Sequence, residues 1–112
     1  MELRQENAGA VAIVAISGRI DSNTSPQLER VLIDTIAAGA PRLVLDLTGT
    51  QYLSSAGLRI LLLTAKQIER ASGRFVLHGL CDRVRDVLDL SGFLSELKVC
   101  SDRTEAVAIA GA

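Results

Sequence analysis

The sequence predicts an α/β fold in which strands and helices follow one another in the order β-β-α-β-α-β-α-β-α. Short apolar runs rich in β-branched residues, such as residues 10–17, are typical of buried strands. Between these runs, apolar side chains recur at the three- and four-residue spacing of an amphipathic helix. Glycine, proline and capping residues separate consecutive segments. Strands connected through helices pair in parallel by right-handed crossovers, so several strands should end at one edge of the sheet.

Two strands and a helix form the first third of the chain. Residues 2–7 alternate loosely and predict a short strand, and Gly9 connects it to the buried strand over 10–17, which favours an antiparallel hairpin. A group of capping residues precedes apolar positions at helical spacing, which predicts a helix over 25–38. The segment Gly39-Ala40-Pro41 should end that helix.

The middle of the chain contains a strand, a loop and the longest predicted helix. The apolar run 43–47 predicts a strand, and Thr48-Gly49-Thr50 is interpreted as the loop that follows it. A helix from Ser55 to about Ala71 places leucines on one face, where they belong to the core. Residues 74–80 then predict another strand.

The last third predicts a helix over 82–91, a short strand over 97–100 and a helix over 102–110. No repeat or linker interrupts the chain, so residues 1–112 are interpreted as a single domain. The topology brings three segments to one sheet edge, and these are residues 18–25, 48–55 and 79–83. Ligands favour this edge in open α/β sheets.

Composition excludes several classes of function. The net charge is −1 and the sequence has no tryptophan, so neither a basic footprint nor stacking aromatics favour nucleic-acid binding. Two distant cysteines, Cys81 and Cys100, and the single histidine, His78, are too few for an obvious zinc site, and no cofactor is expected. The apolar runs are far shorter than the roughly 20 residues of a membrane span. We therefore expect a soluble cytoplasmic protein with reduced thiols and no direct membrane insertion.

Two serines mark the predicted start of the helix in Gln51-Tyr52-Leu53-Ser54-Ser55-Ala56-Gly57-Leu58-Arg59. A serine oxygen at such a place can accept a hydrogen bond from a free backbone N–H group, which is an ordinary helix cap. The same N–H groups and the helix dipole also favour an anion, so a hydroxyl there is well placed to carry a phosphate. Both interpretations stay open, and Asp21 should lie near these serines if the strand order is as predicted.

Four stretches of this sequence resemble the STAS domain family of anti-sigma factor antagonists, over nearly the whole chain. They are Gly18-Arg19-Ile20-Asp21, Leu43-Val44-Leu45-Asp46-Leu47, Tyr52-Leu53-Ser54-Ser55-Ala56-Gly57-Leu58 and Leu88-Asp89-Leu90-Ser91-Gly92-Phe93. The resemblance implies a mixed sheet flanked by about four helices. It also implies a regulator rather than an enzyme, which binds an anti-sigma factor and thereby releases a sigma factor for transcription.

In proteins similar to this one, the anti-sigma factor is also a serine kinase that phosphorylates the antagonist, and a serine phosphatase reverses the modification. The position of the modified serine is Ser55 here, with Ser54 as the alternative because the family often has an aspartate at position 54. Asp21 matches an acidic residue that the family places beside the modified serine. The resemblance implies that the partner surface comprises Asp21, Ser22, Asn23, Thr24, Ser54, Gly57, Leu58 and Arg59.

Two other functions are alternatives to this phosphorylation switch. A STAS subunit that is not phosphorylated and docks on a membrane transport assembly would bind its partner regardless of Ser55. A serine hydrolase would need a G-x-S-x-G turn and a histidine base, but the serines precede Gly57 without this motif and His78 lies within a predicted strand. Neither a P-loop nor a G-x-G-x-x-G motif is present, so the chain is better interpreted as a kinase substrate than as a kinase.

Overall fold

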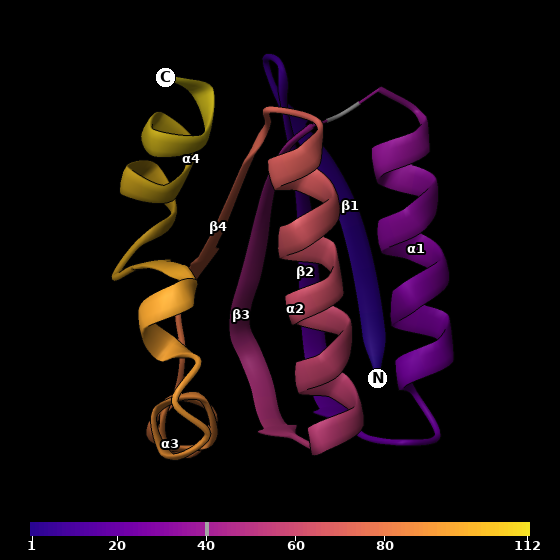
Figure 1. Cartoon of the computed structure of the whole chain (residues 1–112), viewed down its shortest axis with the longest axis vertical. Coiled ribbons are helices and arrows are strands. Elements are labelled where there is room, and N and C mark those ends of the chain that lie inside the picture. The colour runs from indigo at the N-terminus through magenta and orange to yellow at the C-terminus, as the bar shows by residue number, and fades with distance from the viewer. Residues whose placement is uncertain (40) are drawn as a thin grey trace.

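The computed structural model describes residues 1–39 and 41–112 and confirms the predicted α/β order (Figure 1). In chain order, the elements are β1 (Glu2–Ala8), β2 (Val11–Ile20), α1 (Ser25–Ala37), β3 (Arg42–Leu53), α2 (Ser55–Arg70), β4 (Arg74–His78), α3 (Asp82–Leu90), a 3-10 turn (Leu94–Glu96), β5 (Lys98–Cys100) and α4 (Arg103–Gly111). The 3-10 turn was not predicted. Ala40, within the predicted helix stop, lies outside the described residues.

The strands form one mixed sheet in the order β1-β2-β3-β4-β5. β1 pairs with β2 antiparallel, as the short connection at Gly9 predicts, and the following pairs are parallel. Each parallel pair is joined through a helix, so the carboxyl ends of β2, β3 and β4 point the same way. The ends of β2 and β3 and the beginnings of α1 and α2 lie at the lower end of the molecule in Figure 1.

Two strands extend further than the sequence predicts. β2 continues through Gly18 and Arg19 to Ile20, and β3 continues through the predicted loop 48–50 to Leu53. Two register irregularities in the β2–β3 ladder accommodate these polar, glycine-containing segments. The Thr50 hydroxyl donates a hydrogen bond to the Ile16 carbonyl at 2.8 Å, which holds the extension together.

β4 is shorter than predicted, because it ends at His78 rather than at residue 80. The following residue, Gly79, has φ of +77°, in the left-handed region that turns the chain out of the ladder at little cost only for glycine. Its backbone also lies against Thr48, so a side chain at position 79 would collide with β3. The turn at Gly79 thus begins one residue after the last pair with β5, His78↔Cys100.

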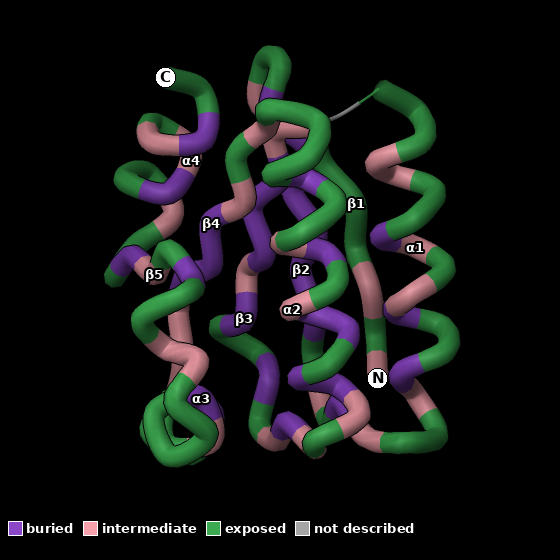
Figure 2. Tube along the Cα trace, viewed as in Figure 1, coloured by how far each residue is buried: buried purple, intermediate pink, exposed green. Residues whose placement is uncertain are grey.

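The helices cover the two faces of the sheet unequally (Figures 1 and 2). α1, α2 and α3 pack on one face and enclose the larger apolar cluster, to which Val14 and Ile16 of β2 contribute. α4 packs on the opposite face, over Val11 and Ile13 of the same strand, in a smaller cluster. The alternation of side chains along β2 therefore supplies both layers.

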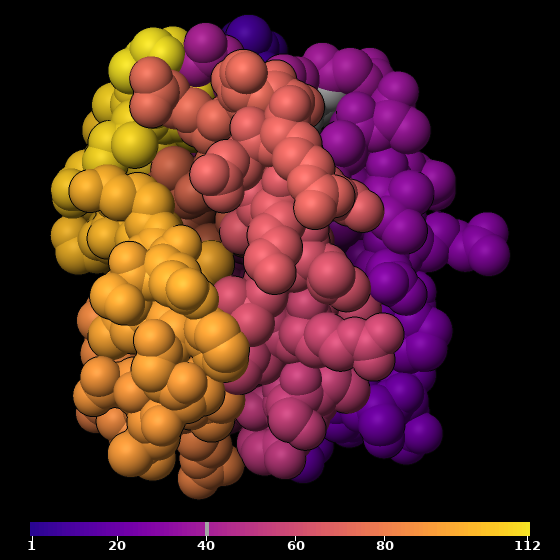
Figure 3. All heavy atoms as spheres, viewed as in Figure 1, coloured from indigo at the N-terminus to yellow at the C-terminus, as the bar shows by residue number. Residues whose placement is uncertain are grey.

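α2 occupies the middle of the face shown in Figure 3, between α1 and the segments from α3 to α4. Its buried side chains include Leu58, Leu61 and Ile68, which confirms that the leucine stripe belongs to the core. No helix in the described part of the chain combines the length and apolar character needed to cross a membrane.

Candidate functional site

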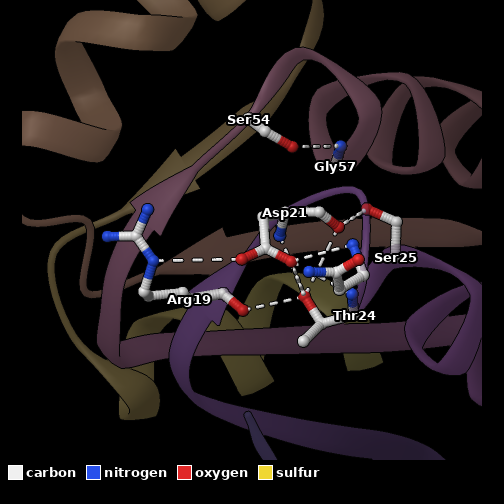
Figure 4. A network of polar contacts seen from close by, with 7 residues as sticks. Arg19, Asp21, Thr24, Ser25, Ser54 and Gly57 are labelled. Atoms are coloured by element: carbon white, nitrogen blue, oxygen red, sulfur yellow. Dashed lines mark hydrogen bonds and ion pairs between the residues drawn. The ribbon is translucent and has the colours of Figure 1, made fainter.

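The candidate site lies where β2 and β3 end and α1 and α2 begin (Figure 4). Ile20 pairs with Leu53 as the last partners of the ladder, and the Ser54 N–H donates to the Ile20 carbonyl at 2.8 Å. This hydrogen bond places the serine pair next to Asp21, which follows Ile20 directly. The prediction that Asp21 and the serines are neighbours in space is confirmed.

Ser54 is the N-cap of α2. Its backbone is extended, with φ of −84° and ψ of 171°, and its hydroxyl accepts a hydrogen bond from the Gly57 N–H at 3.2 Å. Ser54 is half-buried. Its hydroxyl therefore satisfies one of the N–H groups that a helix start leaves unpaired, which is the capping role that the sequence left open.

Ser55 is the first residue of α2 and is exposed. Its hydroxyl makes no hydrogen bond within the described residues, and the cap of the helix is formed by Ser54 instead. The Ser54 side chain is thus engaged as the cap, whereas the Ser55 hydroxyl is exposed, and the modification of Ser55 stays a prediction. The predicted start of this helix at Ser55 is confirmed, and it makes Ser54 the N-cap residue.

Asp21 organises the turn that leads into α1. Its Oδ1 accepts hydrogen bonds from the backbone N–H groups of Asn23 at 2.9 Å and Thr24 at 3.1 Å. The Thr24 hydroxyl in turn accepts from the Asp21 N–H at 2.9 Å and donates to the Arg19 carbonyl at 2.8 Å. Asp21 is therefore a structural residue of the turn as well as a negative charge at the site.

The Asp21 carboxyl is held in its charged form. Partial burial raises its pKa, but the hydrogen bonds from Thr24 and Asn23, together with the nearby Arg19 guanidinium, outweigh this effect and lower the pKa below its usual value. A permanent negative charge consequently lies beside the start of α2 at neutral pH.

Arg19 is a site residue that sequence reasoning missed. Its Nε lies 3.9 Å from Asp21 Oδ2, and its guanidinium carbon lies 4.1 Å from the centre of the Tyr52 ring. Arg19 and Tyr52 are direct partners across the β2–β3 ladder, in the strand extensions that the sequence did not predict. The pair could have been found if both strands had been predicted to continue to residues 20 and 53. Side chains alternate between the two faces of a strand, so strands of that length place Arg19 and Tyr52 on the same face.

The remaining predicted partner residues fall into two groups. Ser22, Asn23 and Arg59 are exposed, as a contact surface requires. Gly57 and Leu58 are buried in the free protein, where Leu58 belongs to the core beneath the helices. Their role as partner contacts stays a prediction, and the packing of α2 on the strand ends accounts for both.

Gly57 allows this close packing. A Cβ atom at this position would lie 2.5 Å from Ile20 Cγ2 and 2.7 Å from Leu53 Cδ1, closer than real contacts permit. The absence of a side chain therefore lets the first turn of α2 rest directly on the last pair of the β2–β3 ladder.

The chemistry available at the site is that of an exposed hydroxyl beside fixed charges. His78 is buried within the sheet, 3.8 Å from Asp46, and in the described structure neither of its ring nitrogens has a hydrogen-bond partner. It therefore does not form the hydrogen bond to a serine that a hydrolase would use. Among residues 1–39 and 41–112, no group of histidine, cysteine and acidic side chains is arranged to hold a metal ion.

Comparison with known proteins supports the resemblance. Residues 3–106 match the STAS domain family. A candidate anti-sigma factor antagonist of Bordetella bronchiseptica, BtrV, is 40% identical over 108 residues, which cover 96% of this chain and 93% of that protein. The crystal structure of an anti-sigma factor antagonist from Mycobacterium paratuberculosis superposes with a TM-score of 0.90 at 27% identity, covering 99% of this chain and 94% of the other. The phosphorylated form of the Bacillus cell fate determinant SpoIIAA shares the fold, with a TM-score of 0.75 at 18% identity and coverage of 96% and 98%.

Proposed function

Because the chain belongs to the STAS domain family, we propose that it is an anti-sigma factor antagonist whose binding is switched off by phosphorylation of Ser55. The observation that carries this proposal is the contrast between the two serines: Ser55 is exposed at the first position of α2, whereas the hydroxyl of Ser54 is occupied as the cap. The partner is an anti-sigma factor that is also a serine kinase. A serine phosphatase returns the protein to its binding form.

The start of α2 suits a residue that carries phosphate in one state. A phosphoserine adds about −1.5 to −2 charges and three acceptor oxygens. Free N–H groups and the positive end of the helix dipole stabilise negative charge at this place. The modified domain should therefore stay folded, and the switch needs no rearrangement of its core.

Partner binding would respond to the same charge in the opposite direction. A partner surface that fits closely against Ser55 would have to bury the phosphate, and burying an unpaired charge is costly. The ionised Asp21 carboxylate already contributes one negative charge beside the serines. Phosphorylation thus abolishes productive binding by repulsion and desolvation.

The test is the intact mass of the protein after incubation with ATP and the candidate anti-sigma factor kinase, for the unaltered chain and for Ser55→Ala and Ser54→Ala. We expect one added phosphate, which is lost in Ser55→Ala and retained in Ser54→Ala. Loss only in Ser54→Ala would move the site to the cap residue. A partner that binds all variants while none is phosphorylated would refute the switch and favour the subunit of a membrane transport assembly.

Binding is measured on the same samples. Calorimetry with the anti-sigma factor should show binding of the unphosphorylated chain and at least a tenfold weaker affinity of the phosphorylated chain, equivalent to about 1.4 kcal/mol. Ser55→Ala should bind and resist the effect of ATP. Equal affinity of the two forms would contradict the proposal even if the phosphate is found.

A further inference from the structure

We propose that the guanidinium of Arg59 binds the phosphoryl group on Ser55, forming an intramolecular clamp in the modified state. This inference rests on the proposed modification of Ser55. The juxtaposition that carries it is the spacing of the two residues on α2, with Ser55 at the first helical position and Arg59 four residues, or about one turn, later (i, i+4). Both are exposed.

Helix geometry directs the Arg59 side chain toward Ser55. Residues four apart lie on the same face, and the Cα–Cβ bonds of a helix tilt toward its N-terminus. The Arg59 side chain therefore extends over the preceding turn, which begins at Ser55. An acidic group N-terminal to a cation at this spacing is also the more favourable of the two orientations.

Arg59 is free to make this contact. In the described structure it forms no ion pair, whereas the other arginine of the site, Arg19, is engaged with Asp21 and the Tyr52 ring. Arg59 borders a hollow of about 210 Å³ between α1 and α2, whose opposite wall includes Glu29. Glu29 does not pair with Arg59, so the phosphate meets an uncommitted cation.

The chemical match favours arginine at this position. A guanidinium presents a planar fork of donors that pairs with two phosphate oxygens at once, and such charge-assisted pairs are stronger than neutral hydrogen bonds. Asp21 follows the end of β2 and lies beside the serines, so its negative charge disfavours a phosphate turned toward that strand. The clamp also removes Arg59 from the surface that the unmodified protein offers to its partner.

The test uses protein with phosphoserine inserted at position 55 during translation, so it requires no kinase. The second pKa of the phosphoserine, near 6 in an unperturbed side chain, is measured by ³¹P NMR titration. A neighbouring cation favours the dianion and lowers this pKa. Arg59→Gln, which retains much of the side-chain stem, should therefore raise this pKa by about 0.15 to 0.4 relative to the unaltered chain, because an exposed pair at this spacing contributes about 0.2–0.5 kcal/mol and one pKa unit corresponds to about 1.4 kcal/mol.

Two further variants make the result specific. Arg70→Ala removes the same charge from the last turn of α2, roughly 20 Å away at 1.5 Å per residue, and should change the phosphoserine pKa by less than about 0.1. Arg59→Lys should give an intermediate value, because it keeps the charge without the fork. Identical titrations of the unaltered chain and Arg59→Gln would overturn the clamp. A protein that the anti-sigma factor kinase does not modify would instead refute the proposed function and leave the titration result standing.

Discussion

Replacing Gly57 by alanine tests whether the first turn of α2 is held against the strand ends as tightly as the structure indicates. The new methyl group would lie 2.5 Å from Ile20 Cγ2 and 2.7 Å from Leu53 Cδ1, more than 1 Å inside an ordinary carbon–carbon separation of about 3.5–4.0 Å. Ile20 is completely buried and Leu53 is 2% exposed, so neither side chain has free space to move into. The overlap must be relieved by displacing the helix start.

The magnitude follows from two opposing contributions. Inserting a methyl group into a packed core costs about 1–3 kcal/mol. Alanine gains about 0.5–1 kcal/mol over glycine within a helix. We therefore expect Gly57→Ala to lower the free energy of unfolding by about 1–2 kcal/mol, although alanine is the better helix former.

The assay is urea unfolding followed by circular dichroism at 222 nm. With a urea dependence of about 1–2 kcal/mol/M, the midpoint of Gly57→Ala should fall by about 1 M. Gly111→Ala is the matched control, because a Cβ there would meet Val11 Cγ2 at an ordinary 3.5 Å, and its midpoint should be unchanged or slightly higher. Amide spectra of Gly57→Ala should also show displaced resonances for Ser54 and Ser55. A midpoint of Gly57→Ala equal to or above that of the unaltered chain would refute the reasoning.

The other predictions concern the Asp21 turn, the Asp46 carboxylate and the two thiols. Thr24→Val should lower the free energy of unfolding by about 1 kcal/mol, because the polar groups that contact the Thr24 hydroxyl would lose their partner. The same change should raise the pKa of Asp21 in a ¹³C NMR titration, and an unchanged pKa would contradict the network. Burial raises the pKa of Asp46, but hydrogen bonds from Thr48 and the charge of nearby groups outweigh this effect and lower the pKa below its usual value. The charged Asp46 carboxylate therefore stabilises the fold at pH values above the pKa of the unfolded chain, about 3.9, and this stabilisation is lost as the pH falls through the lower pKa of the folded protein. The urea midpoints of Asp46→Asn and the unaltered chain should consequently differ most at pH 7 and approach one another at pH 3. Burial, reinforced by the charge of a neighbouring acidic side chain, raises the pKa of the Cys100 thiol. Iodoacetamide at pH 7.5 should therefore label the less buried Cys81 first, and it should label Cys100 at a comparable rate only after the protein is unfolded in urea. Intact mass spectrometry measures both rates.

Much of the fold could be predicted because its local signals agree with one another. The helix over 25–38 had both capping residues and apolar periodicity, and it is observed at Ser25–Ala37. The strand extensions could not be predicted, because glycine and threonine in residues 48–50 are typical of loops and only pairing with β2 keeps them extended. Long-range pairing of this kind leaves no trace in local composition.

The site was predicted less completely than the fold. Topology alone placed Asp21 beside the serines, since parallel crossovers bring strand ends together. The Arg19–Tyr52 contact depends on a register with two irregularities, which is a property of strand pairing that a spacing pattern does not contain. The burial of Leu58, by contrast, agrees with the apolar stripe that helical spacing predicts for α2.

The strand extensions have a consequence for the thermodynamics of association. The backbone before Ser54 is a paired strand up to Leu53 rather than a loop, so it is already ordered before any partner arrives. Binding at this end therefore loses little conformational entropy, a cost that flexible binding loops bear in full. In the proposed switch, a phosphate on Ser55 would have little disorder to create or remove there. We therefore expect its effect on partner affinity to appear mainly as a change in binding enthalpy and salt dependence, with the heat capacity of unfolding unchanged.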